Sequence, residues 1–322
     1  MNIASKRVLI IGVDSDVASK IFDGLDSGNQ PVVGIKSSDI DWESSEEVGR
    51  LLETHTPFLV VNFLGTPLFK LELEDPYPYF KSAIKNIASS CAAVNAIAVH
   101  ISDYHVFGGD RKNSYLEKDP VSPLSDYGEM LVSAEKCFEE SLESFLILRF
   151  SWIIDTTTEN ILTKTLKGLG SSEGVELSAY RRGAPTWQDD IIRVINTVIR
   201  QVMSGATNWG YFHYCSADTC NEFEFGQQVQ TAYAEFLEAK GEIISAAATH
   251  EDETESNNSI DTLKIKSLEP ISAALSCKRI ENNFGVRPRS WRQGLTSRIK
   301  MWAEETGLLE PDQLATDVQL KK

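Results

Sequence analysis

The sequence predicts an α/β protein built on a doubly wound parallel sheet, with a smaller α/β unit after it. Two observations lead to this fold class. Short apolar runs rich in β-branched residues alternate with segments of helical periodicity, and the first run, RVLIIG at 7–12, ends in a glycine directly before a helix. Runs that are apolar throughout are typical of strands covered on both faces. Strands that alternate with helices form βαβ units and therefore a parallel sheet.

The elements of the predicted sheet follow in order along the first half of the chain. The strands are expected at 7–12, 31–36, 57–65, 96–102 and 144–154, and the helices at 16–25, 44–55, 79–95 and 122–142. The segment 44–55 begins with a serine and an acidic first turn, which favour a helix start. The last helix contains the sequence SDYGEMLVSAEK at 125–136, whose tyrosine bears on function below.

The alternation loosens after about residue 155, so we predict two domains. Residues 1–155 form a dinucleotide-binding-type domain, and residues 156–322 form a smaller domain with some chain crossing back. Helical periodicity returns at 161–169, 189–203 and 221–237, a strand is expected at 210–215, and 280–307 is typical of a helix end, a turn and a closing helix. The polar, acidic segment 246–260 has little to bury and is expected to be a mobile loop.

Composition limits the classes of partner. The formal net charge is −16, which argues against nucleic acid or an anionic membrane, since both favour clustered Lys and Arg. No apolar run reaches the roughly 18 residues of a membrane-spanning helix, and the N-terminal run is too short for a signal peptide. The five cysteines are scattered and odd in number. They predict reduced thiols in a cytoplasmic protein, and their spacing fits no metal site.

The first strand is followed by the turn GVDSDVA at 12–18. In a dinucleotide-binding turn, small residues let the backbone approach a diphosphate at the start of the next helix. Gly12 keeps the first glycine position, and Ser15 takes the second. Ser15, Asp16 and Val17 are the candidate cofactor contacts of the helix start. Ser15 adds a side chain and the neighbouring acids add negative charge, so a plain turn that binds nothing is the alternative.

The ends of the next two strands complete the candidate cofactor site. Lys36 stands at the end of the second strand, where an acid often holds the ribose of NAD. A lysine there suits the 2′-phosphate of NADP, and a surface charge is the alternative. Leu64 and Gly65 end the third strand at the same edge of the sheet. NADP is therefore the candidate cofactor, with its binding left open.

Four further blocks resemble one known family. They are VHISDYHVFGG (99–109), YLEKDPVSPLSDYGEMLVSAE (115–135), LILRFSWII (146–154) and GAPTWQDDI (183–191), and WRQGL (291–295) is similar to the family's closing helix. In order and spacing they resemble dTDP-4-dehydrorhamnose reductase and its relatives, over about residues 7–300. These are extended short-chain dehydrogenase/reductases. The resemblance implies a Rossmann-type domain followed by a sugar-nucleotide-binding domain.

The resemblance also implies catalytic positions, and this chain departs from them. The family uses a tyrosine, a lysine four residues later, and a Thr or Ser at the end of the fourth strand. The tyrosine matches Tyr127, but the lysine position holds Leu131. The threonine is matched by Asp103, unless Ser102 substitutes from the neighbouring position. An ionised Asp103 would raise the pKa of a tyrosine that already lacks a nearby cation.

Another lysine would have to replace the missing one. Lys136 lies nine residues after the tyrosine, which at about 100° per residue places it on the other side of the helix. Lys85, on the preceding helix, is the remaining candidate. With the turn, the lysine and the threonine all altered, we predict a degenerate relative, a non-catalytic binding or regulatory protein. The alternative is an NADPH-dependent reductase of a nucleotide-activated 4-keto sugar, with Tyr127 as the proton donor.

The resemblance assigns further residues to the sugar-nucleotide cleft. These are Tyr104, His105, Arg149, Trp152, Arg182 and Trp187. Core positions for the tryptophans, a solvated edge for the arginines and a structural role for the histidine are the alternatives. His105 is also a candidate for acid–base chemistry. A nucleotide sugar or a protein is the expected partner, and a homodimer is the expected assembly if the chain self-associates.

Overall fold

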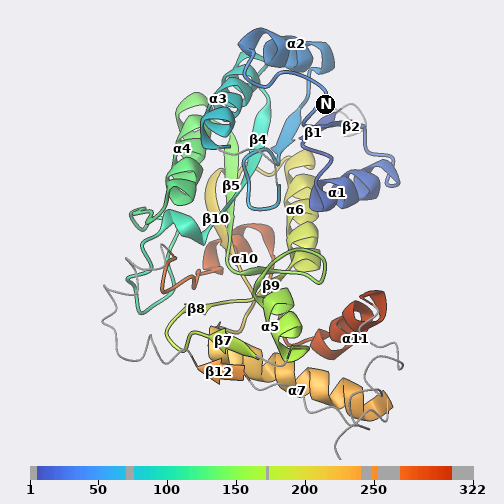
Figure 1. Ribbon diagram of the computed structural model, residues 1–322. Coiled ribbons are helices and arrows are strands. Elements are labelled where there is room, and N and C mark those ends of the chain that lie inside the picture. The colour runs from blue at the N-terminus through green and yellow to red at the C-terminus, as the bar shows by residue number, and fades with distance from the viewer. Residues whose placement is uncertain (1–5, 70–75, 172–173, 241–248, 252–268, 307–322) are drawn as a thin grey trace, which may run out of the picture.

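A six-stranded parallel sheet forms the centre of the protein (Figure 1). The computed structural model describes residues 6–69, 76–171, 174–240, 249–251 and 269–306. The strand order is β10-β5-β4-β3-β1-β2. The bounds of the strands are β1 (Val8–Ile11), β2 (Val32–Ile35), β3 (Leu59–Asn62), β4 (Ile97–Asp103), β5 (Phe145–Phe150) and β10 (Gly210–Tyr214). The predicted fold class is confirmed, because each predicted strand contributes to this sheet.

Helices cover both faces of the sheet. On one side lie α2 (Ser45–His55), α3 (Tyr77–Ala93) and α4 (Asp126–Ser141); on the other lie α1 (Asp16–Asp26) and α6 (Gln188–Met203) (Figure 1). The apolar strand residues are therefore buried from both sides, as in β1, where all four residues are inaccessible. Burial on both faces is the physical reason that these strands carry continuous apolar runs.

The sheet is completed by a strand from the second half of the sequence. β10 pairs in parallel with β5, with Gly210 beside Leu146 and Tyr214 beside Phe150. Its outer side is packed by α10 (Lys278–Phe284). Residues 1–155 therefore do not form the whole sheet, because its edge strand comes from residues 210–214.

The smaller unit packs around a second hydrophobic core, which contains Trp187, Phe225, Trp291 and Trp302. Its helices are α5 (Ile161–Leu169), α7 (Glu222–Lys240) and α11 (Leu295–Glu305), and its short strands are β6 (Ile153–Ile154), β7 (Val175–Leu177), β8 (Arg182–Gly183), β9 (Thr186–Trp187), β11 (Cys220–Asn221) and β12 (Thr249–Glu251). β12 lies within the segment predicted as a mobile loop and pairs in parallel with β7. The other residues of 246–260 lie outside the described residues.

The segment 269–277 joins the two units. The Arg182 amide donates to the Ile271 carbonyl at 2.8 Å, and the Ala273 amide donates to the Arg182 carbonyl at 2.7 Å. On the side of the large sheet, the Ser151 hydroxyl donates to the Ala273 carbonyl at 2.7 Å. This segment therefore forms part of the wall between the two units.

The described part of the chain bears on the expectations about membrane helices, metal sites and cysteines. None of its helices is long and apolar enough to cross a membrane. It holds no group of three or more His, Cys, Asp or Glu side chains that could bind a metal ion. All five cysteines are free thiols, and the Sγ atoms of Cys215 and Cys277 lie 3.6 Å apart.

Candidate functional site

Two adjoining cavities form a cleft at the carboxyl ends of the strands, between the two units. The first has a volume of about 420 Å³, and its lining includes the end of β4 and Glu269. The second, of about 320 Å³, lies at the N-terminus of α1. Pro67, Ile153, Glu159 and Asn160 line both cavities. Ligands of open parallel sheets bind at this end of the strands.

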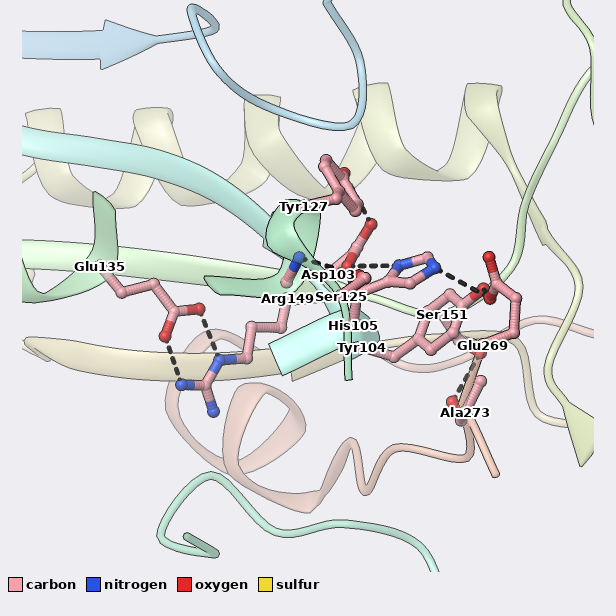
Figure 2. Close-up of polar contacts among 11 residues, drawn as sticks. Asp103, Tyr104, His105, Ser125, Tyr127, Glu135, Arg149, Ser151, Glu269 and Ala273 are labelled. Atoms are coloured by element: carbon pink, nitrogen blue, oxygen red, sulfur yellow. Dashed lines mark hydrogen bonds and ion pairs between the residues drawn. The ribbon is translucent and has the colours of Figure 1, made fainter. Parts of the chain in front are cut away.

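Asp103 is the centre of a hydrogen-bonded series in the wall of the first cavity (Figure 2). It is the last residue of β4, and its Oδ1 accepts from the backbone amide of His105 at 2.8 Å, which caps a short 3₁₀ turn at Tyr104–Val106. That turn directs the His105 ring toward Asp103, so that Nδ1 of the ring lies 2.9 Å from Asp103 Oδ1. The Tyr127 hydroxyl donates to Oδ2 at 3.0 Å.

The series continues to Glu269, which lies between β12 and α10 in the sequence (Figure 2). His105 Nε2 lies 3.0 Å from Glu269 Oε2, and the Tyr104 hydroxyl donates to the same oxygen at 3.4 Å. The His105 ring also contacts the Tyr104 ring, at 4.1 Å between centroids, and meets the Tyr127 ring edge-on at 5.1 Å. Two carboxylates and two phenols thus surround one imidazole.

The electrostatics of the series follow from burial and these contacts. Burial alone would lower the pKa of His105, but Asp103 and Glu269 outweigh it and raise that pKa to about 10. Burial, followed by the charge of Asp103, raises the pKa of Tyr127 well above its usual value of 10. Tyr104 has a similarly raised pKa, from burial and Glu269. At neutral pH the imidazole is charged and both phenols keep their protons.

The position of Tyr127 agrees with the sequence prediction, whereas its expected partners differ. Ser125 caps α4 by accepting from the Gly128 amide at 3.2 Å, which places Tyr127 in the first turn. Leu131 is completely buried in the core. Lys85 is exposed on α3, and the groups that shift the pKa of Tyr127 include no lysine. Among the described residues, the surroundings of Tyr127 thus give no support to Lys85 as a replacement for the missing lysine.

Ser102 also differs from its expected role. Its side chain is completely buried, and its hydroxyl has no hydrogen-bond partner among the described residues. Successive side chains of a strand point to opposite faces, so Asp103 reaches the cavity while Ser102 does not. Ser102 is absent from the lining of the first cavity, whereas the carboxylate of Asp103 is part of it; a catalytic role for either residue stays a prediction.

The turn before α1 has the backbone form that the sequence predicts. Gly12 has a φ of +79°, and a Cβ there would lie 3.2 Å from the Phe63 Cβ and 3.3 Å from the Phe69 ring. Only glycine adopts this conformation readily. The Ser15 hydroxyl donates to the Leu68 carbonyl at 2.7 Å, and both residues line the second cavity. The Ser15 side chain makes no cap hydrogen bond to α1, so it does not occupy the amides at the helix start.

The charge of this second cavity is negative. Asp14, Asp16, Asp155 and Glu159 line it, and its lining among the described residues includes no Lys or Arg. Three of these acids have local partners. Asp14 accepts from the Ser37 amide and hydroxyl at 2.9 and 2.5 Å, Asp16 pairs with Lys20 at 2.8 Å, and Asp155 accepts from the two threonines that follow Thr156. The partners lessen the repulsion that a bound diphosphate would meet.

The predicted cofactor residues fall into two groups. Ser15, Asp16 and Val17 line the second cavity. The others, Gly12, Lys36, Leu64 and Gly65, do not line it. Gly12, Leu64 and Gly65 shape the strand ends beneath it, and Lys36 is exposed at the end of β2, where its amide donates to Asp39. A role for these residues in cofactor binding stays a prediction.

Three of the predicted substrate residues line the first cavity, namely Tyr104, His105 and Trp152. The Trp152 indole lies directly on Gly183, where an added Cβ would come within 2.3 Å of the ring. Trp187 is buried in the second core, and its Nε1 donates to the Trp291 carbonyl at 2.7 Å. It borders a different cavity. The core alternative thus describes Trp187 better than ligand contact does.

The predicted arginines do not line the first cavity. Arg149 is buried within the sheet, where its Nε and Nη2 donate to Glu135 at 2.7 and 2.6 Å. Arg182 is exposed, whereas its neighbour Arg181 lines the cavity, 3.5 Å from Glu222. Sequence reasoning missed Glu269. No sequence pattern marks that residue, because only the path of 269–277 across both units brings it beside His105.

Comparisons with known proteins give the family. A sequence model described as RmlD substrate binding domain matches residues 6–303. The dTDP-4-dehydrorhamnose reductase of Aggregatibacter actinomycetemcomitans is 23% identical, with 92% of this chain and 99% of the relative covered. The protein of the same name from Escherichia coli is 24% identical, with 83% and 88% covered.

Solved structures agree with the fold. The dTDP-4-dehydrorhamnose reductase of Clostridium acetobutylicum has a TM-score of 0.73 at 22% identity, covering 92% of this chain and 99% of that one. The Bacillus anthracis protein of the same name, solved in complex with NADP, has a TM-score of 0.72 at 19% identity with the same coverage. Since the family match extends from the first described residue almost to the last, this chain belongs to the RmlD substrate binding domain family.

Proposed function

We propose that this protein reduces a keto group of a nucleotide-activated sugar with NADPH. The observation that supports the proposal is the hydrogen-bonded series Tyr127–Asp103–His105 at the end of β4, of which Asp103 and His105 line the cleft. Reduction of a carbonyl needs a proton donor beside the carbon that receives hydride. Relatives that match nearly their whole length are named dTDP-4-dehydrorhamnose reductases, which supports this reaction class.

The turn at the start of α1 fits a dinucleotide in its backbone shape. Gly12 has the left-handed conformation of such a turn, and the Ser15 hydroxyl bonds to Leu68 instead of capping α1, so the Ser15 side chain does not compete with a diphosphate for the first amides of the helix. Lys36 is the candidate for the 2′-phosphate of NADPH. When bound, the nicotinamide would supply the hydride. The carboxylates that line the same cavity oppose a diphosphate, so we expect modest affinity.

The nucleotide sugar would bind in the first cavity. The Trp152 indole offers an apolar face, and Lys164 and Arg181 supply positive charge beside the four carboxylates of the lining, Asp103, Glu159, Glu222 and Glu269. An arginine suits the diphosphate of a nucleotide sugar. Tyr127, which the sequence predicts as the proton donor, and His105 are the two candidates for that role within the series.

Binding of a nucleotide sugar without reduction is the second candidate function. The specific observation in its favour is Leu131, which is buried where the family's lysine would stand. A tyrosine without that cation, hydrogen-bonded to a carboxylate, keeps its proton firmly. A binding or regulatory protein of this fold would need the first cavity and not the second.

One experiment separates the two functions. The purified protein is titrated calorimetrically with NADPH and NADH, and NADPH oxidation is then followed with dTDP-4-keto-6-deoxy-D-glucose as the substrate. The reductase is supported by equal amounts of NADPH consumed and alcohol formed, and by loss of both in Ser15→Asp, which adds a charge at the start of α1. Binding of the nucleotide sugar with no NADPH binding or oxidation would support the second function instead.

A further inference from the structure

We propose that His105 is the group that gives the proton to the substrate oxygen and that Asp103 orients the His105 ring. Tyr127 is connected to His105 only through its hydrogen bond to Asp103. This inference deepens the proposed function and rests on it. It replaces the tyrosine expected from the family with a histidine that belongs to this chain's own arrangement.

The geometry fits a doubly protonated ring between two ionised carboxylates. Nδ1 lies 2.9 Å from Asp103 and Nε2 lies 3.0 Å from Glu269. An ionised carboxylate only accepts hydrogen bonds, so each ring nitrogen must carry a hydrogen to make both contacts. His105 is therefore held as an imidazolium, with one hydrogen on each side.

The two sides of the ring differ in access. Asp103 is only 6% exposed and also accepts from Tyr127, so the Nδ1 side is fixed within the protein. Glu269 is 44% exposed and lines the first cavity, so the Nε2–H bond points toward the cleft. A histidine with one nitrogen fixed by a carboxylate and the other presented to substrate is a standard acid–base arrangement.

Tyr127 has a less favourable position for the same task. Its hydroxyl donates to the side of Asp103 away from His105, and it is absent from the residues that line the first cavity. Asp103 and His105 are both among them. A substrate oxygen in the cavity would meet Nε2–H of His105 by taking the place of the Glu269 oxygen.

The proton transfer balances with bound NADPH as the reductant. NADPH would supply the hydride and its electron pair to the carbonyl carbon, and the carbonyl π-electrons would move to oxygen. That oxygen takes the hydrogen of Nε2, an O–H bond forms, and the N–H electron pair stays on the ring. His105 ends neutral, with Nδ1–H still donating to Asp103, and NADPH ends as NADP⁺. Solvent in the cleft then restores the proton to Nε2.

The charged and titratable groups around the ring set its pH dependence. Asp103 faces it from β4, Tyr104 stacks on it, Tyr127 approaches from α4, and Glu269 closes the cleft side. Glu222 and Arg181 line the same cavity further away. The carboxylates favour the charged ring, so proton donation should persist through neutral pH and fail in the alkaline range.

The first test is nuclear magnetic resonance of the wild-type protein with ¹⁵N-labelled histidine. The His105 signals are assigned by their loss in His105→Gln, and His55→Gln on α2 serves as the matched control. We expect both ring nitrogens to be protonated at pH 7.5, and saturating dTDP-4-keto-6-deoxy-D-glucose to shift the Nε2 signal more than the Nδ1 signal. A ring with one proton at that pH, or an unaltered Nε2 signal in the bound state, overturns the proposal.

The second test compares turnover of His105→Gln and Tyr127→Phe. Loss of a general acid typically costs 10²–10⁴-fold, so we expect kcat of His105→Gln to fall by at least about 100-fold, with KM little changed. Tyr127→Phe should lose less than about tenfold. The reverse order would overturn the role of His105 and leave the reductase proposal standing.

Absence of turnover in the wild type would instead overturn the proposed function and this inference's reductive step. The resonance experiment would still decide whether His105 meets the nucleotide sugar. If His105→Gln does not fold, as judged by circular dichroism beside His55→Gln, assignment through Asp103→Asn keeps the first test decisive.

Discussion

The buried ion pair between Arg149 and Glu135 gives a quantitative test of where this arginine acts. The sequence resemblance assigns Arg149 to the substrate cleft, but the structure buries it in a bidentate pair. The two side chains are 3% and 2% exposed. Removing one partner of such a pair leaves a charge without compensation and costs about 3–5 kcal/mol. We therefore expect Glu135→Leu to destabilise the protein strongly.

The surroundings of Arg149 reduce this cost slightly. Its guanidinium lies over the Tyr211 ring at 4.6 Å and the Phe107 ring at 5.1 Å, and Nη1 is 3.5 Å from His213 Nε2. Burial, followed by the charge of Arg149, holds the pKa of His213 well below its usual value, so this imidazole is neutral. Cation–π contacts contribute about 0.5–2 kcal/mol. About 3 kcal/mol of destabilisation is the expected result.

Urea denaturation measures the effect. With a slope of about 3 kcal/mol/M, the midpoint for Glu135→Leu should fall by roughly 1 M. The double variant Glu135→Leu/Arg149→Met should recover most of the loss, because it leaves no unpaired charge. Calorimetry should show that the folded double variant binds the nucleotide sugar as the wild type does.

The opposite pattern would refute the reasoning. If Arg149→Met alone keeps its stability but binds the nucleotide sugar tenfold more weakly, the arginine acts in the cleft. If the double variant is as unstable as Glu135→Leu, the loss arises from packing and not from an unpaired charge.

Three further outcomes follow from the site. The pKa of His105 is raised from 6.5 to about 10, so its contribution to the free energy of unfolding is fully present below pH 6.5 and is lost as the pH rises toward 10, with an upper bound of about 5 kcal/mol. The urea midpoints at pH 6.5 and pH 9.5 should therefore differ less in Asp103→Asn than in the wild type. An unchanged difference would contradict this expectation. Gly183→Ala forces the Trp152 indole aside, so we expect the free energy of unfolding to fall by about 1–3 kcal/mol and the nucleotide sugar to bind more weakly. An unaltered melting temperature and affinity would be inconsistent with the contact. Since carboxylates line the cavity at α1, added salt should screen their repulsion of NADPH. Calorimetry at two ionic strengths should show tighter binding of NADPH at the higher one. Weaker binding there would indicate that cations dominate that site.

Most of the sheet could be predicted because its signals are local. Continuous apolar runs mark strands covered on both faces, and the glycine at residue 12 marks a left-handed turn that other residues adopt with strain. The position of Tyr127 in the first turn of α4 likewise follows from the Ser125 cap. Each of these features depends on residues close together in the sequence.

The chemistry of the cleft depends on contacts that are distant in sequence. Leu131 and Asp103 could be recognised as departures, but the second carboxylate beside His105 could not. Glu269 meets His105 across 164 positions of sequence, and no periodicity encodes that contact. The burial of Arg149 could not be predicted from the sequence either. An arginine within an apolar strand is equally compatible with a position in the cleft and with an ion pair to a residue on α4.

The late origin of β10 has a consequence for synthesis on the ribosome. β5 ends at Phe150, yet the strand that covers its open edge begins at Gly210. Until that later segment emerges, the nascent chain presents an unpaired parallel edge of apolar residues, which is a template for pairing with other chains. We expect the emerging polypeptide to depend on chaperones during this interval, and a fragment that stops at residue 155 to aggregate rather than fold.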